Sequence, residues 1–181
     1  MKLYQIPLKE GDKMYKIEPL TGSLIYFEYD ETIIKSNYPK KLLKALELCN
    51  NPYLLLPYNI SVQHQIRKNA LLIAKLISVT SKVNFWASNH LDSVIKPKYT
   101  DSKQGIEVFR QIYSKKKQDE MCLPRSIFAA SMSKEFRKSG VIFIGVFLPS
   151  KSMHAWIIEN VMQPDVNDNI WINFKPVAAI C

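Results

Sequence analysis

The chain has 181 residues, of which 47 % are hydrophobic and 23 % are charged. This composition is typical of a globular protein with its own core, and it excludes a disordered or fibrous chain. Lys and Arg outnumber Asp and Glu, and the net charge is +9. The charge favours an acidic partner, such as nucleic acid, an anionic membrane surface or an acidic peptide, while a solvated basic surface explains it equally well.

Neither the N-terminus nor the longest apolar run is typical of a membrane-associated protein. The first residues, MKLYQIPLKEGDK, lack the apolar core of a signal peptide. The longest apolar run, residues 70–79, is interrupted by Lys75 and falls short of the ~20 residues that span a bilayer. The sequence therefore predicts a soluble, cytoplasmic protein with no membrane partner.

The glycines and cysteines indicate no cofactor. The chain has only 5 Gly and contains neither GxGxxG nor a phosphate-binding GxxxxGK loop. Its three cysteines, Cys49, Cys122 and Cys181, are odd in number and widely spaced, which argues against a disulfide framework or a zinc site. We expect neither a cofactor nor a metal ion.

The first part of the chain reads as strands followed by helices. Residues 1–30 predict strands, with Met14–Glu18 and Ser23–Tyr29 on either side of a turn. A helix is predicted from Pro39 to about Asn50, with Cys49 as a buried filler on its apolar side. After a connector, Gln63 to about Thr80 predicts a helix that is apolar on most sides and should therefore be buried.

The last third of the chain is the most regular. After a short helix over Ile106–Ser114, a helix is predicted from Cys122 to about Lys138. The apolar run Val141–Phe147 predicts a strand in the middle of a sheet. A second strand begins at His154, and Ile170–Phe174 is a candidate third strand.

Cys122 is the candidate nucleophile. Pro124 fixes a helix start within a residue or two of it, so the thiol lies beside unpaired N–H groups and the positive end of the helix dipole. Such surroundings favour the thiolate, and the same N–H groups can stabilise an oxyanion. A cysteine that only packs at a helix start is the alternative.

His154 is the candidate base. The helix carries the chain away from Cys122, the strand Val141–Phe147 brings it back, and His154 follows that strand after a polar turn. The two side chains can therefore meet, as a Cys–His pair requires.

A third group should orient the imidazole, and two aspartates are near in sequence. A two-residue turn at Glu159–Asn160 would place Asp165 directly opposite His154. Asp168 would need a turn at Val161–Met162, which is poor turn chemistry, so Asp165 is preferred. If the strand instead continues to Met162 and turns over Pro164–Asn169, neither aspartate reaches His154. Glu159 is interpreted as a turn residue.

Three stretches carry a resemblance to a known family: MCLPRSIFAA over Met121–Ala130, GVIFIG over Gly140–Gly145 and MHAW over Met153–Trp156. They resemble the leader peptidases (B-type proteins) of lasso-peptide biosynthesis, which belong to the transglutaminase-like, papain-related superfamily. The resemblance is specific over Cys122–Ser126 and His154–Trp156.

The resemblance implies both a reaction and a fold. The reaction is removal of a leader from a ribosomally made precursor by a triad of Cys122, His154 and Asp165, before a partner cyclase of the asparagine-synthetase type closes a macrolactam ring. The implied fold is α+β, with a transglutaminase-like core in residues 61–181 whose nucleophile helix packs on an antiparallel sheet. Residues 1–60 would be a winged-helix-like module that binds the leader as an added strand, or else an elaboration of the peptidase core.

Two other functions fit the same residues. One is acyl transfer through a thioester at Cys122 instead of hydrolysis. The other is a non-enzymatic, basic winged-helix protein that binds nucleic acid, although the densest basic run, Lys115–Lys117, is followed at once by Asp119 and Glu120.

Overall fold

The computed structural model describes residues 1–11, 13–18, 23–27, 38–55, 69–83, 95–113, 121–165 and 170–181. The strands are, in chain order, β1 (Leu3–Gln5), β2 (Leu8–Glu10), β3 (Lys13–Ile17), β4 (Leu24–Phe27), β5 (Val141–Phe147), β6 (Ser152–Ile158) and β7 (Lys175–Ile180). The helices are α1 (Lys40–Asn50), α2 (Ala70–Val83), α3 (Ser102–Ile112), α5 (Cys122–Met132) and α6 (Phe136–Ser139), with short 3-10 helices η2 (Pro52–Leu54) and η5 (Ile170–Asn173). The described strands all pair antiparallel, so the predicted α+β class is confirmed.

The main sheet has the strand order β1-β7-β5-β6. β5 lies between two neighbours and is buried from Val141 to Val146, which explains its continuous apolar sequence. β6 is an edge strand, and its pairing with β5 sets His154 opposite Gly145. The strands predicted over Val141–Phe147 and from His154 are both present.

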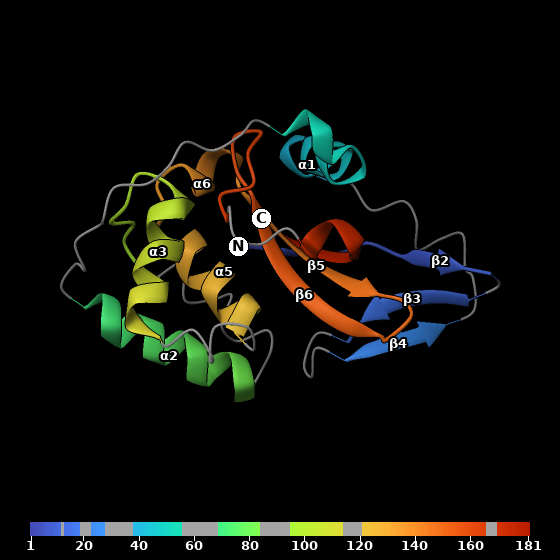
Figure 1. Ribbon diagram of the computed structural model, residues 1–181, viewed down its shortest axis with the longest axis horizontal. Helices are drawn as coiled ribbons and strands as arrows, with labels where there is room; N and C mark the ends of the chain where they lie inside the picture. The colour runs from blue at the N-terminus through green and yellow to red at the C-terminus, as the bar shows by residue number, and fades with distance from the viewer. Residues whose placement is uncertain are drawn as a thin grey trace.

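Helices cover the two faces of this sheet. Figure 1 shows α2, α3 and α5 together on one side of β5 and β6, with α1 on the other. α5 packs closely on α3 at Gly105: a Cβ at this position would lie only 2.7 Å from Ala129 Cα, too close for any residue other than glycine. On the other face, Leu42 of α1 shares a buried cluster with Phe143 and Trp156.

The N-terminal part of the chain belongs to the same core. β1 pairs with β7, so the first residues complete a sheet whose other strands follow residue 140. β2, β3 and β4 form a second, small sheet, visible at one end of the molecule in Figure 1. Ile17 of β3 is fully buried in the cluster that contains α5. Described residues on both sides of the predicted boundary near residue 60 therefore share one sheet and one buried cluster. The assignment of residues 1–60 to a leader-binding module, or to an elaboration of the peptidase core, stays a prediction.

The long helix predicted from Cys122 to Lys138 is in fact two helices. α5 ends at Met132, and α6 begins at Phe136. Ser133 makes the break: its backbone is extended, and its hydroxyl accepts a 2.9 Å hydrogen bond from the Phe136 N–H. A serine hydroxyl that competes for backbone groups is a common cause of such an interruption.

Two further predictions are wrong. Ile170–Phe174 does not form a strand: η5 occupies Ile170–Asn173, since this turn buries Trp171 against Trp156 at a centroid distance of 5.7 Å. The predicted burial of α2 on most sides also fails, because one side of α2 is exposed, with Leu72 at 67 %. Of its predicted range, residues 63–68 lie outside the described residues.

Candidate active site

Cys122 is the first residue of α5 and is half-buried. Pro124 lies in the first turn, where a missing N–H costs no helical hydrogen bond. The residue before the helix, Met121, provides no side-chain cap. The thiol therefore lies at the positive end of the helix dipole, as the sequence predicted.

β6 brings His154 to this helix start. As an edge strand, β6 leaves alternate backbone groups without a strand partner, and α5 binds those of Ala155. Ser126 Oγ donates to the Ala155 carbonyl at 3.4 Å, and the Ala155 N–H donates to the Cys122 sulfur. The His154 side chain, next along the strand, hydrogen-bonds with Cys122. The structure thus brings the predicted nucleophile and base together.

These contacts lower the pKa of Cys122 below its ordinary value. Burial is the largest influence and by itself raises the pKa. The hydrogen bond and charge of His154, the Ala155 N–H and the charge of Arg125 act in the opposite direction and together outweigh burial. The arrangement favours a thiolate–imidazolium pair, which is the reactive form of a cysteine nucleophile.

The other two cysteines have different surroundings. Burial raises the pKa of Cys49 to about 12, and the Trp156 indole N–H offsets this only in part. Burial also raises the pKa of Cys181, although the Lys41 charge opposes it. At neutral pH both remain thiols, so Cys122 alone has the surroundings of a nucleophile.

Aromatic rings hold the imidazole of His154. Its ring lies 5.3 Å from that of Phe174 and stacks at 6.4 Å on Trp156, as measured between centroids. The cross-strand partner must be glycine, because a Cβ at Gly145 would lie 2.7 Å from Trp156 and 2.9 Å from the Lys175 carbonyl. The sequence did not single out Gly145 for this role.

Asp165 is buried, but its carboxylate lies among arginines. It forms a hydrogen-bonded ion pair with Arg110 of α3 and an ion pair at 3.1 Å with Arg125. The predicted turn at Glu159–Asn160 is wrong by one residue: Glu159 pairs with Met162, and Asn160 and Val161 form the turn with positive φ. The register that placed Asp165 opposite His154 is therefore not formed. Asp168 lies outside the described residues.

Glu159 is a residue that the sequence reasoning missed. It is buried, and its carboxylate accepts hydrogen bonds from the Ser102 N–H at 2.9 Å, the Ser102 hydroxyl at 2.7 Å and the Ser133 hydroxyl at 2.8 Å. Burial raises its pKa, while these donors act against the rise. Because this carboxylate must reach α3, Glu159 stays in line with β6 and the turn begins one residue later. An acidic residue next to a strand gives no such signal in the sequence.

The described residues also bear on metal binding and on membrane crossing. No group of three or more His, Cys, Asp or Glu side chains in those residues is arranged to hold a metal ion. Within the same residues, no helix combines the length and apolarity that crossing a bilayer requires. A comparison of the chain with protein-family models, curated proteins and solved structures finds no match.

Proposed function

We propose that this protein is a cysteine peptidase with a transglutaminase-like core, which removes the leader from a lasso-peptide precursor. The observation that carries the proposal is the Cys122–His154 pair at the start of α5, with a lowered thiol pKa. Cysteine peptidases use this constellation for acyl transfer to water. The substrate class comes from the resemblance over Cys122–Ser126 and His154–Trp156.

In the proposed reaction, the Cys122 thiolate attacks the carbonyl carbon of the scissile peptide bond. The oxyanion that forms is stabilised by free N–H groups at the start of α5. Its collapse breaks the C–N bond, and the His154 imidazolium gives its proton to the departing amine of the core peptide. His154 then takes a proton from water, which hydrolyses the thioester and releases the leader as a carboxylic acid.

The positive charge of Arg125, on the same helix as Cys122, also supports the proposal. Its charge acts on the Cys122 sulfur, and Asp165 fixes its guanidinium from the other side. We infer that Asp165 influences Cys122 at least indirectly, by holding the guanidinium of Arg125 in place. Its membership of a Cys-His-Asp triad remains a prediction, as does that of Asp168.

The test is cleavage of a cognate precursor by Cys122→Ala. We expect the variant to fold and to lose cleavage, because no other group supplies the thiolate, whereas Cys49→Ala keeps it. Undiminished cleavage by Cys122→Ala would refute the proposal. Mass spectrometry with added primary amines separates the two reactions of a thioester: amide products would assign the site to an acyl transferase instead of a peptidase.

A further inference from the structure

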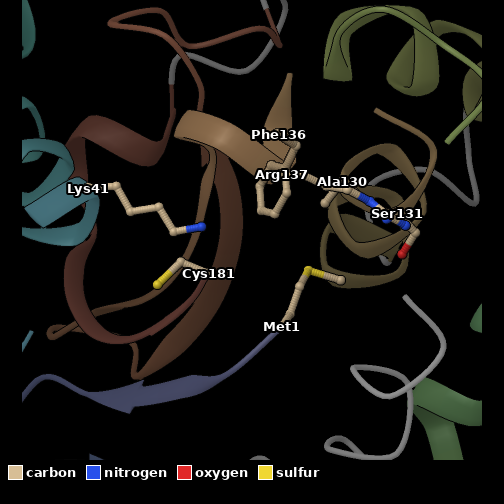
Figure 2. A pocket seen from close by; sticks show the side chains of 7 residues that line it. All are labelled: Met1, Lys41, Ala130, Ser131, Phe136, Arg137 and Cys181. Atoms are coloured by element: carbon tan, nitrogen blue, oxygen red, sulfur yellow. The ribbon is translucent and has the colours of Figure 1, made fainter. Parts of the chain in front are cut away.

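A pocket of about 280 Å³ lies between α1, α5, α6 and the two chain ends, as Figure 2 shows. Ser131, one of the residues that line it, is nine residues after Cys122 on α5, which corresponds to roughly 13 Å along a helix axis. This pocket is therefore separated from the thiol. The surfaces that meet a substrate at the cut bond must border the Cys122–His154 pair itself.

Two aromatic rings contact the imidazole of His154, and they differ in exposure. Trp156 stacks on it along the same face of β6 and is only 1 % exposed. Phe174 lies 5.3 Å from it, between ring centroids, and is half-buried. The ring of Phe174 also lies 6.0 Å from that of Phe147, which is 37 % exposed. Aromatic surface therefore extends from the base to the solvent through Phe174 and Phe147, which we call the aromatic shelf.

The register of the main sheet explains how the aromatic shelf forms. β5 pairs Gly145 with His154, and Phe147 follows two residues later, so its side chain lies diagonal to the histidine on the same face. Phe174 directly precedes β7, which pairs with the other side of β5. Its ring therefore crosses β5 to contact both Phe147 and the imidazole.

The position of the aromatic shelf selects the part of the substrate that it contacts. In the proposed reaction the acyl group bonds to Cys122, while the departing amine takes its proton from His154. The residues that follow the cut bond therefore lie on the His154 side of the site, where the shelf begins. Resting on the proposed function, we propose that the aromatic shelf binds an apolar side chain within the first two residues after the cut bond.

Charge decides between the two kinds of side chain that aromatic rings bind. An aromatic face also attracts cations. However, Lys151 lies in the turn that follows Phe147, Lys175 follows Phe174 directly, and both lysines are exposed. Together with the net charge of +9, they disfavour a lysine or arginine of the substrate. An apolar side chain gains from leaving water, and its contact with two rings corresponds to a preference of about tenfold over serine.

The first test measures binding without cleavage. Leucyl-leucinamide and seryl-serinamide imitate the amine side of the cut chain and carry the same charge. Each is titrated into the full chain, and the rate of Cys122 alkylation by iodoacetamide is followed by peptide mapping. We expect leucyl-leucinamide to protect Cys122 at about tenfold lower concentration than seryl-serinamide. Equal protection by both, or protection by neither, would overturn the proposal, and stronger protection by lysyl-lysinamide would overturn it in favour of a cation site.

Substitutions of Phe147 locate the binding on the aromatic shelf. Phe147→Ala should abolish the preference for leucyl-leucinamide, and Phe147→Leu, which keeps an apolar surface, should retain most of it. The matched control is Leu72→Ala, which removes an exposed apolar side chain from α2, on the other face of the main sheet. If Phe147→Ala keeps the preference, or Leu72→Ala loses it, the assignment is wrong. A shift in the pH profile of Cys122 alkylation without amide would show that the ring only positions His154, which would also overturn the proposal.

Cleavage of the precursor provides the second test and separates the shelf from the peptidase. Leucine and serine are placed in turn at the first and second positions after the cut bond, and kcat/KM should favour leucine by about tenfold at one of them. Phe147→Ala should lower cleavage of the leucine substrate more than that of the serine substrate. Cleavage without any preference refutes only the shelf. Protection by leucyl-leucinamide with no cleavage of the precursor refutes only the peptidase.

Discussion

At the scale of single residues, three cysteines in one chain have three different environments. Cys122 has donors and positive charges around its sulfur, whereas Cys49 packs against an apolar cluster. Near Cys181, the charges of Lys41, Lys2 and the N-terminus offset the effect of burial only in part. Thiolate content controls alkylation, so these differences can be measured in one molecule. Cys49 and Cys181 act as internal controls for Cys122.

We predict that iodoacetamide modifies Cys122 selectively below the ordinary pH range of thiols. Because the pKa of Cys122 is lowered, its rate should rise at a lower pH than that of an ordinary thiol, while Cys49, with a pKa of about 12, stays unmodified at neutral pH. Peptide mapping across a pH series gives all three rates. His154→Ala should shift the Cys122 profile to higher pH, and identical profiles for the three cysteines would contradict the proposed pairing.

Asp165 is predicted to matter for stability. It is 3 % exposed and faces two arginines, of which Arg125 is itself buried. Asp165→Asn leaves that buried charge without its partner, and removal of one member of a buried pair costs about 3–5 kcal/mol. Urea unfolding should show this loss. The comparison is Arg110→Gln, which removes the more exposed arginine and should lower the free energy of unfolding by less. If both variants lose equally little stability, the ion pairs of Asp165 do not behave as buried ones.

At the scale of elements, Glu159 connects the end of β6 to the start of α3 and to the break between α5 and α6. Ser102 is the first residue of α3, and Ser133 separates α5 from α6. One carboxylate thereby fixes the elements that carry His154 and Cys122.

Substitutions of Glu159 should separate its hydrogen bonds from its charge. Glu159→Ala leaves the buried Ser102 N–H without an acceptor, which costs about 1–3 kcal/mol. Glu159→Gln keeps an acceptor and loses the charge. The pKa of Glu159 is raised, so its stabilising contribution is complete below about pH 4, the usual range of a glutamate, and declines as pH rises through the folded-state value.

Urea unfolding of the original protein and Glu159→Gln over that pH range provides the measurement. The stability of the original protein should fall relative to the Gln variant as pH rises. A constant difference between the two would show that Glu159 ionises as readily in the folded protein as in the unfolded chain.

The sequence predicted the elements whose signal is local and missed those set by distant contacts. The helix start at Cys122 and the strand Val141–Phe147 follow from a proline and a continuous apolar run. The Ser133 hydroxyl at the break between α5 and α6 and the residue before the Asn160–Val161 turn meet in the hydrogen bonds of Glu159, whose partners lie up to 57 residues away. The shift of that turn by one residue removes the register from which Asp165 was placed opposite His154.

At the scale of the whole molecule, the first and last strands are neighbours. β1 pairs with β7, and Lys2 and Cys181 exchange backbone hydrogen bonds at 2.8 and 3.1 Å. α1 meanwhile covers the face of the sheet opposite α5. The main sheet therefore depends on residues from both halves of the chain, and we expect the described parts to unfold together.

Leu42→Ala tests this cooperativity. Leu42 of α1 is 0 % exposed and belongs to the cluster that contains Val141, Phe143 and Trp156, so the cavity should cost about 2–5 kcal/mol. The loss should lower the stability of β5 and β6 together with that of α1, in a single urea transition that amide exchange of both strands follows. Leu43→Ala is the matched control, because the neighbouring side chain is 53 % exposed and should change stability by less than about 0.5 kcal/mol. If residues 1–60 were an independent module, Leu42→Ala would unfold that module alone and leave exchange in β5 and β6 unchanged.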